Sequence, residues 1–159
     1  MNYEAKGIKT FRGMEGEGYN ADLYRDGKKV AFVIDDATGG MLDVEWLDRK
    51  EEKILADHCK TLPDRPAGFL DEGKEPMMAV TPEIFIEDLV NDALLLKDAA
   101  KLTKGKIAFV DKGKMWTMKL GAHTLEAATA HVRAKHPEAS ILNGREPREV
   151  LAIMRALQG

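Results

Sequence analysis

Alternating hydrophobic and polar positions dominate the first forty-odd residues, as in β-strands that have one covered face. Four stretches predict strands, and they are residues 3–11, 19–23, 30–34 and 42–46. The Asp26-Gly27 pair lies between the second and third stretches and predicts a tight hairpin turn, because Gly adopts positive φ without strain. The third stretch is almost continuously apolar, which predicts a central strand covered on both faces.

Helical spacing appears after residue 47. Apolar residues between 48 and 62 recur at intervals of three, four and seven and predict an amphipathic helix. Thr81, Pro82 and Glu83 suit the start of a long helix that reaches about residue 102. The remaining predicted elements are a second hairpin over residues 107–118, helices over 124–135 and from Pro147, and a short strand over 139–142.

This order of elements predicts an α+β fold. We expect an antiparallel β-meander of about four strands plus a helix in residues 1–62, and a helix–hairpin–helix–helix lobe in residues 81–159. The proline-containing segment 63–80 predicts a linker or a long surface loop. Within it, Met77-Met78 either anchors the loop in the core or forms an exposed contact point. Two lobes and one compact domain are both compatible with 159 residues.

Composition places the chain among ordinary globular proteins, with 44% hydrophobic and 32% charged residues. Cys59 is the only cysteine, so no intrachain disulfide forms, which suits a reducing compartment. The first residues lack an apolar signal core, and no apolar run approaches the roughly 20 residues that span a bilayer. We therefore expect a cytoplasmic protein without a membrane partner.

The net charge of −3 is mild, but it is unevenly distributed. Residues 1–80 hold 12 Lys and Arg against 17 Asp and Glu, whereas residues 81–159 hold 12 against 10. A dedicated nucleic-acid-binding protein shows a stronger basic excess than the second half does. A nucleic acid is therefore not the partner that the overall charge favours.

Four carboxylates are expected to converge at one end of the meander, and they belong to Glu15, Glu17, Asp35 and Asp36. In an up-and-down meander, the loop before the second strand and the end of the third strand lie at the same edge. Such a group could hold a hard divalent cation, which prefers oxygen ligands. It could also meet a basic protein surface, or consist of turn residues that point into water.

A basic cluster surrounds the second predicted hairpin and includes Lys106, Lys112, Lys114 and Lys119. Lysines beside an exposed Trp116 would grip phosphates and stack a base, as in a nucleic-acid-binding module. The alternative is structural. Trp116 shares a strand face with Met118 and Leu120, which predicts a place in the core, and lysines at a sheet edge discourage unwanted strand pairing.

No catalytic or cofactor motif is present in the chain. His131 and His136 are five residues apart and so lie on different faces of a helix, which does not match zinc-ligand spacing. The adjacent helical residues His58 and Cys59 do not face each other, and Ser140 is not in a nucleophile-elbow pattern. We predict no catalytic residues and no cofactor, and we interpret the chain as a binding protein rather than an enzyme.

The stretches Gly16–Asn20 and Leu23–Ala31 give the sequence a resemblance to small uncharacterised proteins encoded by bacteriophages and other mobile elements. The resemblance covers under a third of the chain. It implies a protein that binds a host protein, including a component of host defence. We therefore predict a non-catalytic protein that acts through protein–protein contact. The alternatives are a divalent-cation-dependent enzyme or ligand-binding protein using the acidic edge, and a nucleic-acid-binding module using the lysine-rich hairpin.

Overall fold

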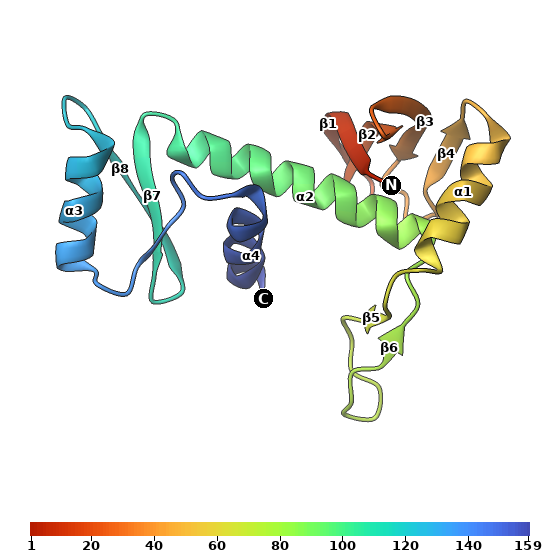
Figure 1. Cartoon of the computed structure of the whole chain (residues 1–159). Helices are drawn as coiled ribbons and strands as arrows, with labels where there is room; N and C mark the ends of the chain where they lie inside the picture. Colours follow the sequence, from red (N-terminus) through yellow and green to blue (C-terminus); the bar gives the residue numbers. More distant parts are fainter. The chain divides into compact units, whose positions relative to one another are not determined.

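The computed structural model describes all 159 residues and divides them into two compact units, residues 1–91 and 92–159. The boundary falls within helix α2 (Pro82–Thr103), so α2 contributes residues to both units. The predicted 63–80 segment belongs to the first unit. Figure 1 shows the order of the elements along the chain. A four-stranded antiparallel sheet, a second hairpin sheet and four helices confirm the predicted α+β class.

The first unit is built on an antiparallel sheet with the strand order β1-β2-β3-β4. Its strands are β1 (Tyr3–Gly13), β2 (Gly16–Arg25), β3 (Lys28–Asp35) and β4 (Asp43–Trp46), and helix α1 (Arg49–Cys59) follows. The predicted up-and-down meander is therefore confirmed. Asp26 and Gly27 have φ values of +49° and +80°, the two positive values that a type I′ hairpin turn requires.

A β-bulge explains why residues 30–34 are almost continuously apolar. The pairing of β2 with β3 shifts between Leu23 and Tyr24, and the consecutive residues Val30 and Ala31 are both buried. An extra residue in one strand allows two neighbours to enter the same core. Phe32 lies on the other face and is only half-buried, so the expectation that both faces are covered was wrong.

Two sets of contacts hold α1 against the sheet. The rings of Tyr3, His58 and Phe85 lie with centroids 5.3–5.5 Å apart and join β1, α1 and the first part of α2. Arg25 on β2 donates two hydrogen bonds of 2.8 Å to the buried carboxylate of Glu51 on α1. This bidentate, charge-assisted arrangement is the geometry in which a buried carboxylate is best satisfied.

Residues 63–80 form a narrow hairpin arm rather than a structureless linker. Its short strands are β5 (Arg65–Pro66) and β6 (Met77–Met78), visible as a hairpin in Figure 1. The tip closes through two backbone hydrogen bonds between Asp71 and Lys74, of 2.8 and 2.9 Å. Phe69 and Leu70 near the tip are 59% and 73% exposed. Met77 is also exposed and Met78 is half-buried, so Met77 is a surface residue rather than a core anchor.

The second unit is a three-stranded sheet with helices on both faces. Besides the end of α2, it contains β7 (Lys106–Asp111), β8 (Lys114–Lys119), α3 (Leu125–Lys135), β9 (Ser140–Ile141) and α4 (Pro147–Gln158). The strand order is β8-β7-β9. Alternate residues of β7 point to opposite faces, so the sheet supports two separate hydrophobic clusters.

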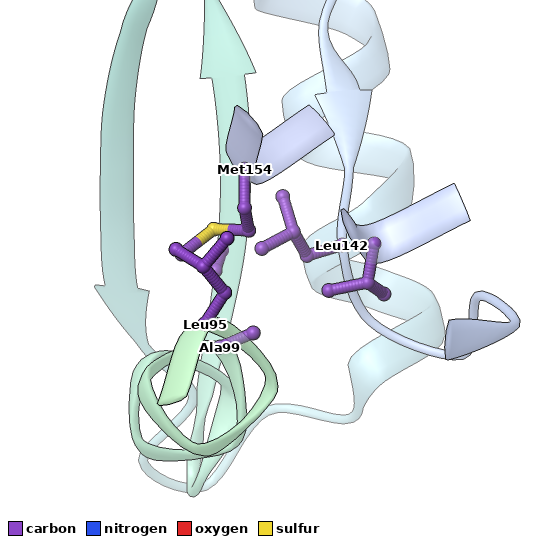
Figure 2. Packing of buried hydrophobic residues seen from close by; sticks show 6 residues of the cluster. Leu95, Ala99, Leu142 and Met154 are labelled. Carbon is purple, nitrogen blue, oxygen red and sulfur yellow. The ribbon is translucent and has the colours of Figure 1, made fainter. Parts of the chain in front are cut away.

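Figure 2 shows the first cluster, in which Leu95 and Ala99 of α2 meet Leu142 and Met154. Ala108 on β7 supplies the sheet side of this cluster. The second cluster joins α3 to the other face of the sheet, and its buried members are Ile107, Phe109, Val132 and Ile141. No helix of the chain is long and apolar enough to cross a membrane.

Candidate functional site

The predicted convergence at one end of the first sheet is present in the backbone. The Glu15 N–H in the β1–β2 turn donates a 2.9 Å hydrogen bond to the Ala37 carbonyl after β3. Tyr19 on β2 is paired with Asp35 at the end of β3. These contacts bring the turn and the β3–β4 loop to the same edge. We call the surface formed by Glu15, Glu17, Asp35 and Asp36 the acidic end.

Two of the four carboxylates shape the loop that follows β3. Asp35 accepts a 2.9 Å hydrogen bond from the Ala37 N–H. Asp36 accepts hydrogen bonds of 3.1 and 2.7 Å from the backbone N–H and the hydroxyl of Thr38. These bonds from Thr38 lower the pKa of Asp36. Asp35 and Asp36 therefore act as turn-forming residues, as aspartates often do after a strand.

The other two carboxylates have no partner within the chain. Glu15 and Glu17 are exposed and form no side-chain hydrogen bond or ion pair within the chain. The Glu15 carboxylate lies against Gly39, where an added Cβ would be 2.3 Å from Oε2. Glu17 lies opposite Arg12 in the β1–β2 pairing. The acidic end thus contains two unpaired carboxylates, of Glu15 and Glu17. The carboxylates of Asp35 and Asp36 stabilise the loop after β3.

The divalent-cation hypothesis gains no geometric support at this end. No group of three or more His, Cys, Asp or Glu side chains in the chain is arranged to hold a metal ion. Asp35 and Asp36 direct oxygens toward backbone donors of their own loop.

Two exposed methionines lie in the loops of the acidic end, and sequence reasoning missed both. Met14 in the β1–β2 turn is 93% exposed, and Met41 before β4 is 84% exposed. Both follow a glycine, and that position in a Gly-rich turn is the signal that could have identified them. Exposed methionines are adaptable apolar contact residues, common at surfaces that bind other proteins.

A second acidic group lies near Tyr19, where α2 begins. Glu83 Oε1 accepts a 3.0 Å hydrogen bond from the Leu42 N–H. Burial raises the pKa of Glu87, and the charges of Glu83 and Asp35 raise it further. The Tyr19 hydroxyl is buried and has no hydrogen-bond partner in the protein, and burial raises its pKa as well. This group was not predicted, because the position of Glu83 after Thr81 and Pro82 is typical of a residue that starts a helix.

Replacing Glu87 with Gln should raise stability at neutral and alkaline pH. Because the pKa of Glu87 is raised in the folded state, ionisation destabilises the fold as pH rises from about 4.3, the unfolded value. We expect a Tm about 2 °C above that of the unmodified protein at pH 8. The difference in Tm between the variant and the unmodified protein should become smaller as the pH falls toward 4.

Thermal denaturation followed by circular dichroism between pH 4 and pH 8 measures the effect. The exposed Glu138, which lies after α3, provides the control, and Glu138→Gln should leave Tm within about 2 °C. A Glu87→Gln difference that stays constant with pH would show that ionisation of Glu87 does not oppose folding.

The basic hairpin is the second candidate surface, formed by Lys106, Lys112, Lys114 and Lys119 on β7, β8 and their turn. Lys106 and Lys119 are paired at one end of the hairpin, while Lys112 and Lys114 lie at the turn. Asp111 is the one carboxylate of the hairpin, and it lies 2.7 Å from Nδ1 of His136. The lysine side chains therefore form most of the charged surface here.

Trp116 is 51% exposed, so the prediction that it belongs to the core was wrong. It lies opposite Phe109 on β8, the outermost strand. The helix on this face, α3, packs through Val132 against residues of β7 and β9, while Met118 and Leu120 fill the margin of the cluster. Strand alternation correctly gave the face of Trp116, but the helix does not reach far enough to cover it.

A groove of about 360 Å³ lies between the end of β8 and α3. Its lining residues are Met118, Lys119, Leu120, His123, Ala127, Ala128 and His131. The lining contains apolar side chains and nitrogen-bearing side chains but no carboxylate. The groove was not foreseen, because the spacing of eight residues between His123 and His131 does not match a metal-ligand motif.

The His58-Cys59 pair has a structural role. His58 packs between the rings of Tyr3 and Phe85. Cys59 is buried, and burial raises the pKa of its thiol. A protonated thiol is a poor nucleophile, so this arrangement favours core packing over cysteine chemistry.

Comparison with known proteins gives no matching family model, no matching curated protein and no matching solved structure. The two surfaces described above are therefore the basis for proposing a function.

Proposed function

We propose that the chain is a non-catalytic binding protein that acts through protein–protein contact at the acidic end. The observation that carries this proposal is a pair of almost fully exposed methionines in the loops of this end. Met14 is next to Glu15 in the sequence, and Met41 follows two residues after Gly39, against which the Glu15 carboxylate lies. Large apolar side chains surrounded by charge are typical of contact surfaces. Asp35 and Asp36 support this surface by ordering its loop.

The charge of the first unit favours a basic partner. Residues 1–91 hold 12 Lys and Arg against 20 Asp and Glu, a formal charge of −8. A charge of this sign accelerates encounter with a positively charged surface and disfavours acidic competitors. The resemblance to phage-encoded proteins suggests a host protein as the partner, including a component of host defence, in the cytoplasm.

The exposed arm supports protein contact independently. Phe69 and Leu70 are exposed near a tip that is fixed by its own turn, and Arg65 at its base forms an ion pair with Asp88. A tip ordered before binding loses less conformational entropy when it meets a partner. The first unit therefore carries two exposed apolar surfaces, the acidic end and the arm.

Removing the contact groups of the acidic end should abolish partner capture without unfolding the protein. We expect the combined change Met14→Ser, Glu15→Ala, Glu17→Ala and Met41→Ser to reduce recovery of the bound protein by about 30-fold, the effect of losing an interface hot spot of about 2 kcal/mol. All four side chains are exposed, so Tm should change by less than about 2 °C.

Quantitative pull-down from lysate of cells carrying the gene identifies the partner, and calorimetry with the purified partner measures the affinity. A control with Glu52→Ala and Asp57→Ala changes two exposed carboxylates on α1, away from both proposed contact surfaces, and should bind normally. A separate variant with Asp35→Asn and Asp36→Asn tests the loop. Unchanged recovery with the four-residue variant would contradict the proposal.

A further inference from the structure

Trp116 is the one aromatic side chain of the second unit that is exposed, since Phe109 is buried. It lies on β8, whose outer edge has no neighbouring strand. A half-exposed indole on an open strand edge offers a flat surface on which a nucleic-acid base can stack. Such stacking contributes about 1–3 kcal/mol per base and tolerates every base.

Positive charge surrounds this ring. Lys114 lies two residues before Trp116, on the same face of β8, and Lys112 lies in the adjoining turn. Lys119 lies five residues from Lys114, about 17 Å along an extended strand. Lys114 therefore lies beside the exposed ring, while Lys119, on the opposite face of β8, lines the groove at the end of the strand.

The charge of the whole second unit agrees with that of the hairpin. Residues 92–159 hold 12 Lys and Arg against 7 Asp and Glu, a formal charge of +5. This positive excess is larger for residues 92–159 than for residues 81–159, because the first part of α2 is acidic. Neutralisation of phosphates by such a surface releases counterions and favours binding.

The groove beside α3 continues this surface. Met118 shares the β8 face with Trp116 and lines the groove, and Lys119, His123 and His131 add nitrogen-bearing groups. With no carboxylate in its lining, the groove does not repel an anionic chain. Its volume of about 360 Å³ is in the range of pockets that hold small planar ligands.

We propose that the second unit binds single-stranded nucleic acid along β8, with one base stacked on Trp116 and a neighbouring base at the groove. Lys112, Lys114 and Lys119 hold the phosphates. This activity goes beyond the protein contact proposed for the first unit. A single strand is favoured over a duplex because its unpaired bases expose the faces on which an aromatic ring stacks. A protein partner is less favoured, since lysine is depleted in protein–protein interfaces.

Fluorescence anisotropy of the full chain with labelled oligo(dT) of about 20 nucleotides tests the proposal. With these three lysines in contact, log K should fall with log salt concentration with a slope of about −2. Trp116→Ala should weaken binding about 10-fold at unchanged slope, because it removes stacking and no charge. Combining Lys112→Gln, Lys114→Gln and Lys119→Gln should bring the slope close to zero, because it removes all three contacts.

Matched controls use equivalent residues of the first unit. Trp46→Phe and the triple change Lys28→Gln, Lys50→Gln and Lys53→Gln should leave oligo(dT) affinity within about twofold, because they lie outside the proposed site. Trp116→Ala should leave capture of the protein partner intact, which distinguishes this proposal from that for the acidic end.

Three results would overturn the proposal. The first is no anisotropy change at 50 mM salt. The second is an oligo(dT) affinity that Trp116→Ala does not lower and that equals the affinity for inorganic polyphosphate. That result would show nonspecific attraction of polyanions. The third is tighter binding of a duplex of the same length, which would exclude base stacking on Trp116 as the source of affinity.

Discussion

Gly18→Ala should destabilise the protein by about 3 kcal/mol, at the upper end of the usual cost of overpacking. Gly18 is buried on β2, and a Cβ there would be 2.3 Å from the Asp35 carbonyl oxygen and 2.6 Å from the Phe11 ring. Phe11 can rotate away, but the carbonyl belongs to the backbone of β3. The strands must therefore separate where Tyr19 pairs with Asp35.

Thermal denaturation should show a Tm about 8 °C below that of the unmodified protein. Hydrogen exchange should show reduced protection at the end of β3. Gly40→Ala is the matched control, since the nearest atom to its added Cβ is the Thr38 hydroxyl at 3.8 Å. We expect that control to retain its Tm within about 2 °C. Equal Tm values for the two variants would show that β3 does not constrain the Gly18 position.

Asn143→Ala should have the second-largest effect, a loss of about 2 kcal/mol. The Ala108 N–H on β7 donates a 2.8 Å hydrogen bond to Oδ1 of Asn143, and Nδ2 of Asn143 donates a 2.9 Å bond to the Lys106 carbonyl. Ala108 is fully buried, so its N–H cannot turn to water when the amide is removed. The Asn143 side chain thus continues the pairing of β9 with β7.

Thermal denaturation should show a Tm about 6 °C below that of the unmodified protein. Hydrogen exchange should show reduced protection of the amides of β7. Asn91 on α2 provides the control, because it is exposed and its side chain forms no hydrogen bond. Asn91→Ala should leave stability unchanged or slightly higher, since alanine favours helix more than asparagine does. A Tm for Asn143→Ala equal to that of this control would contradict the bridging role.

Local patterns allowed most of the elements to be predicted. Asp26-Gly27 defines its turn through backbone geometry alone, and Thr124 caps α3 by accepting a hydrogen bond from the Ala127 N–H. The convergence of Glu15 with the end of β3 also followed from the meander order, because antiparallel neighbours return to the same edge. These features depend on residues close in sequence or on strand order.

Other features depend on how far one element extends over another. Strand alternation identified the face of Trp116, but exposure required the position of α3 across the sheet. Likewise, the β-bulge near Val30 could not be recognised from the sequence. A bulge that buries consecutive residues and a strand covered on both faces both produce a continuous apolar run.

The sequence by itself determined the α+β class, the meander and its turns, since these follow from periodicity and backbone preference. Only the tertiary structure decided which carboxylates of the acidic end are free. Asp35 and Asp36 bond to their own loop, whereas Glu15 and Glu17 face outward beside Met14. The composition fits either arrangement, because a carboxylate has the same charge whether a neighbouring N–H satisfies it or it remains available to a partner.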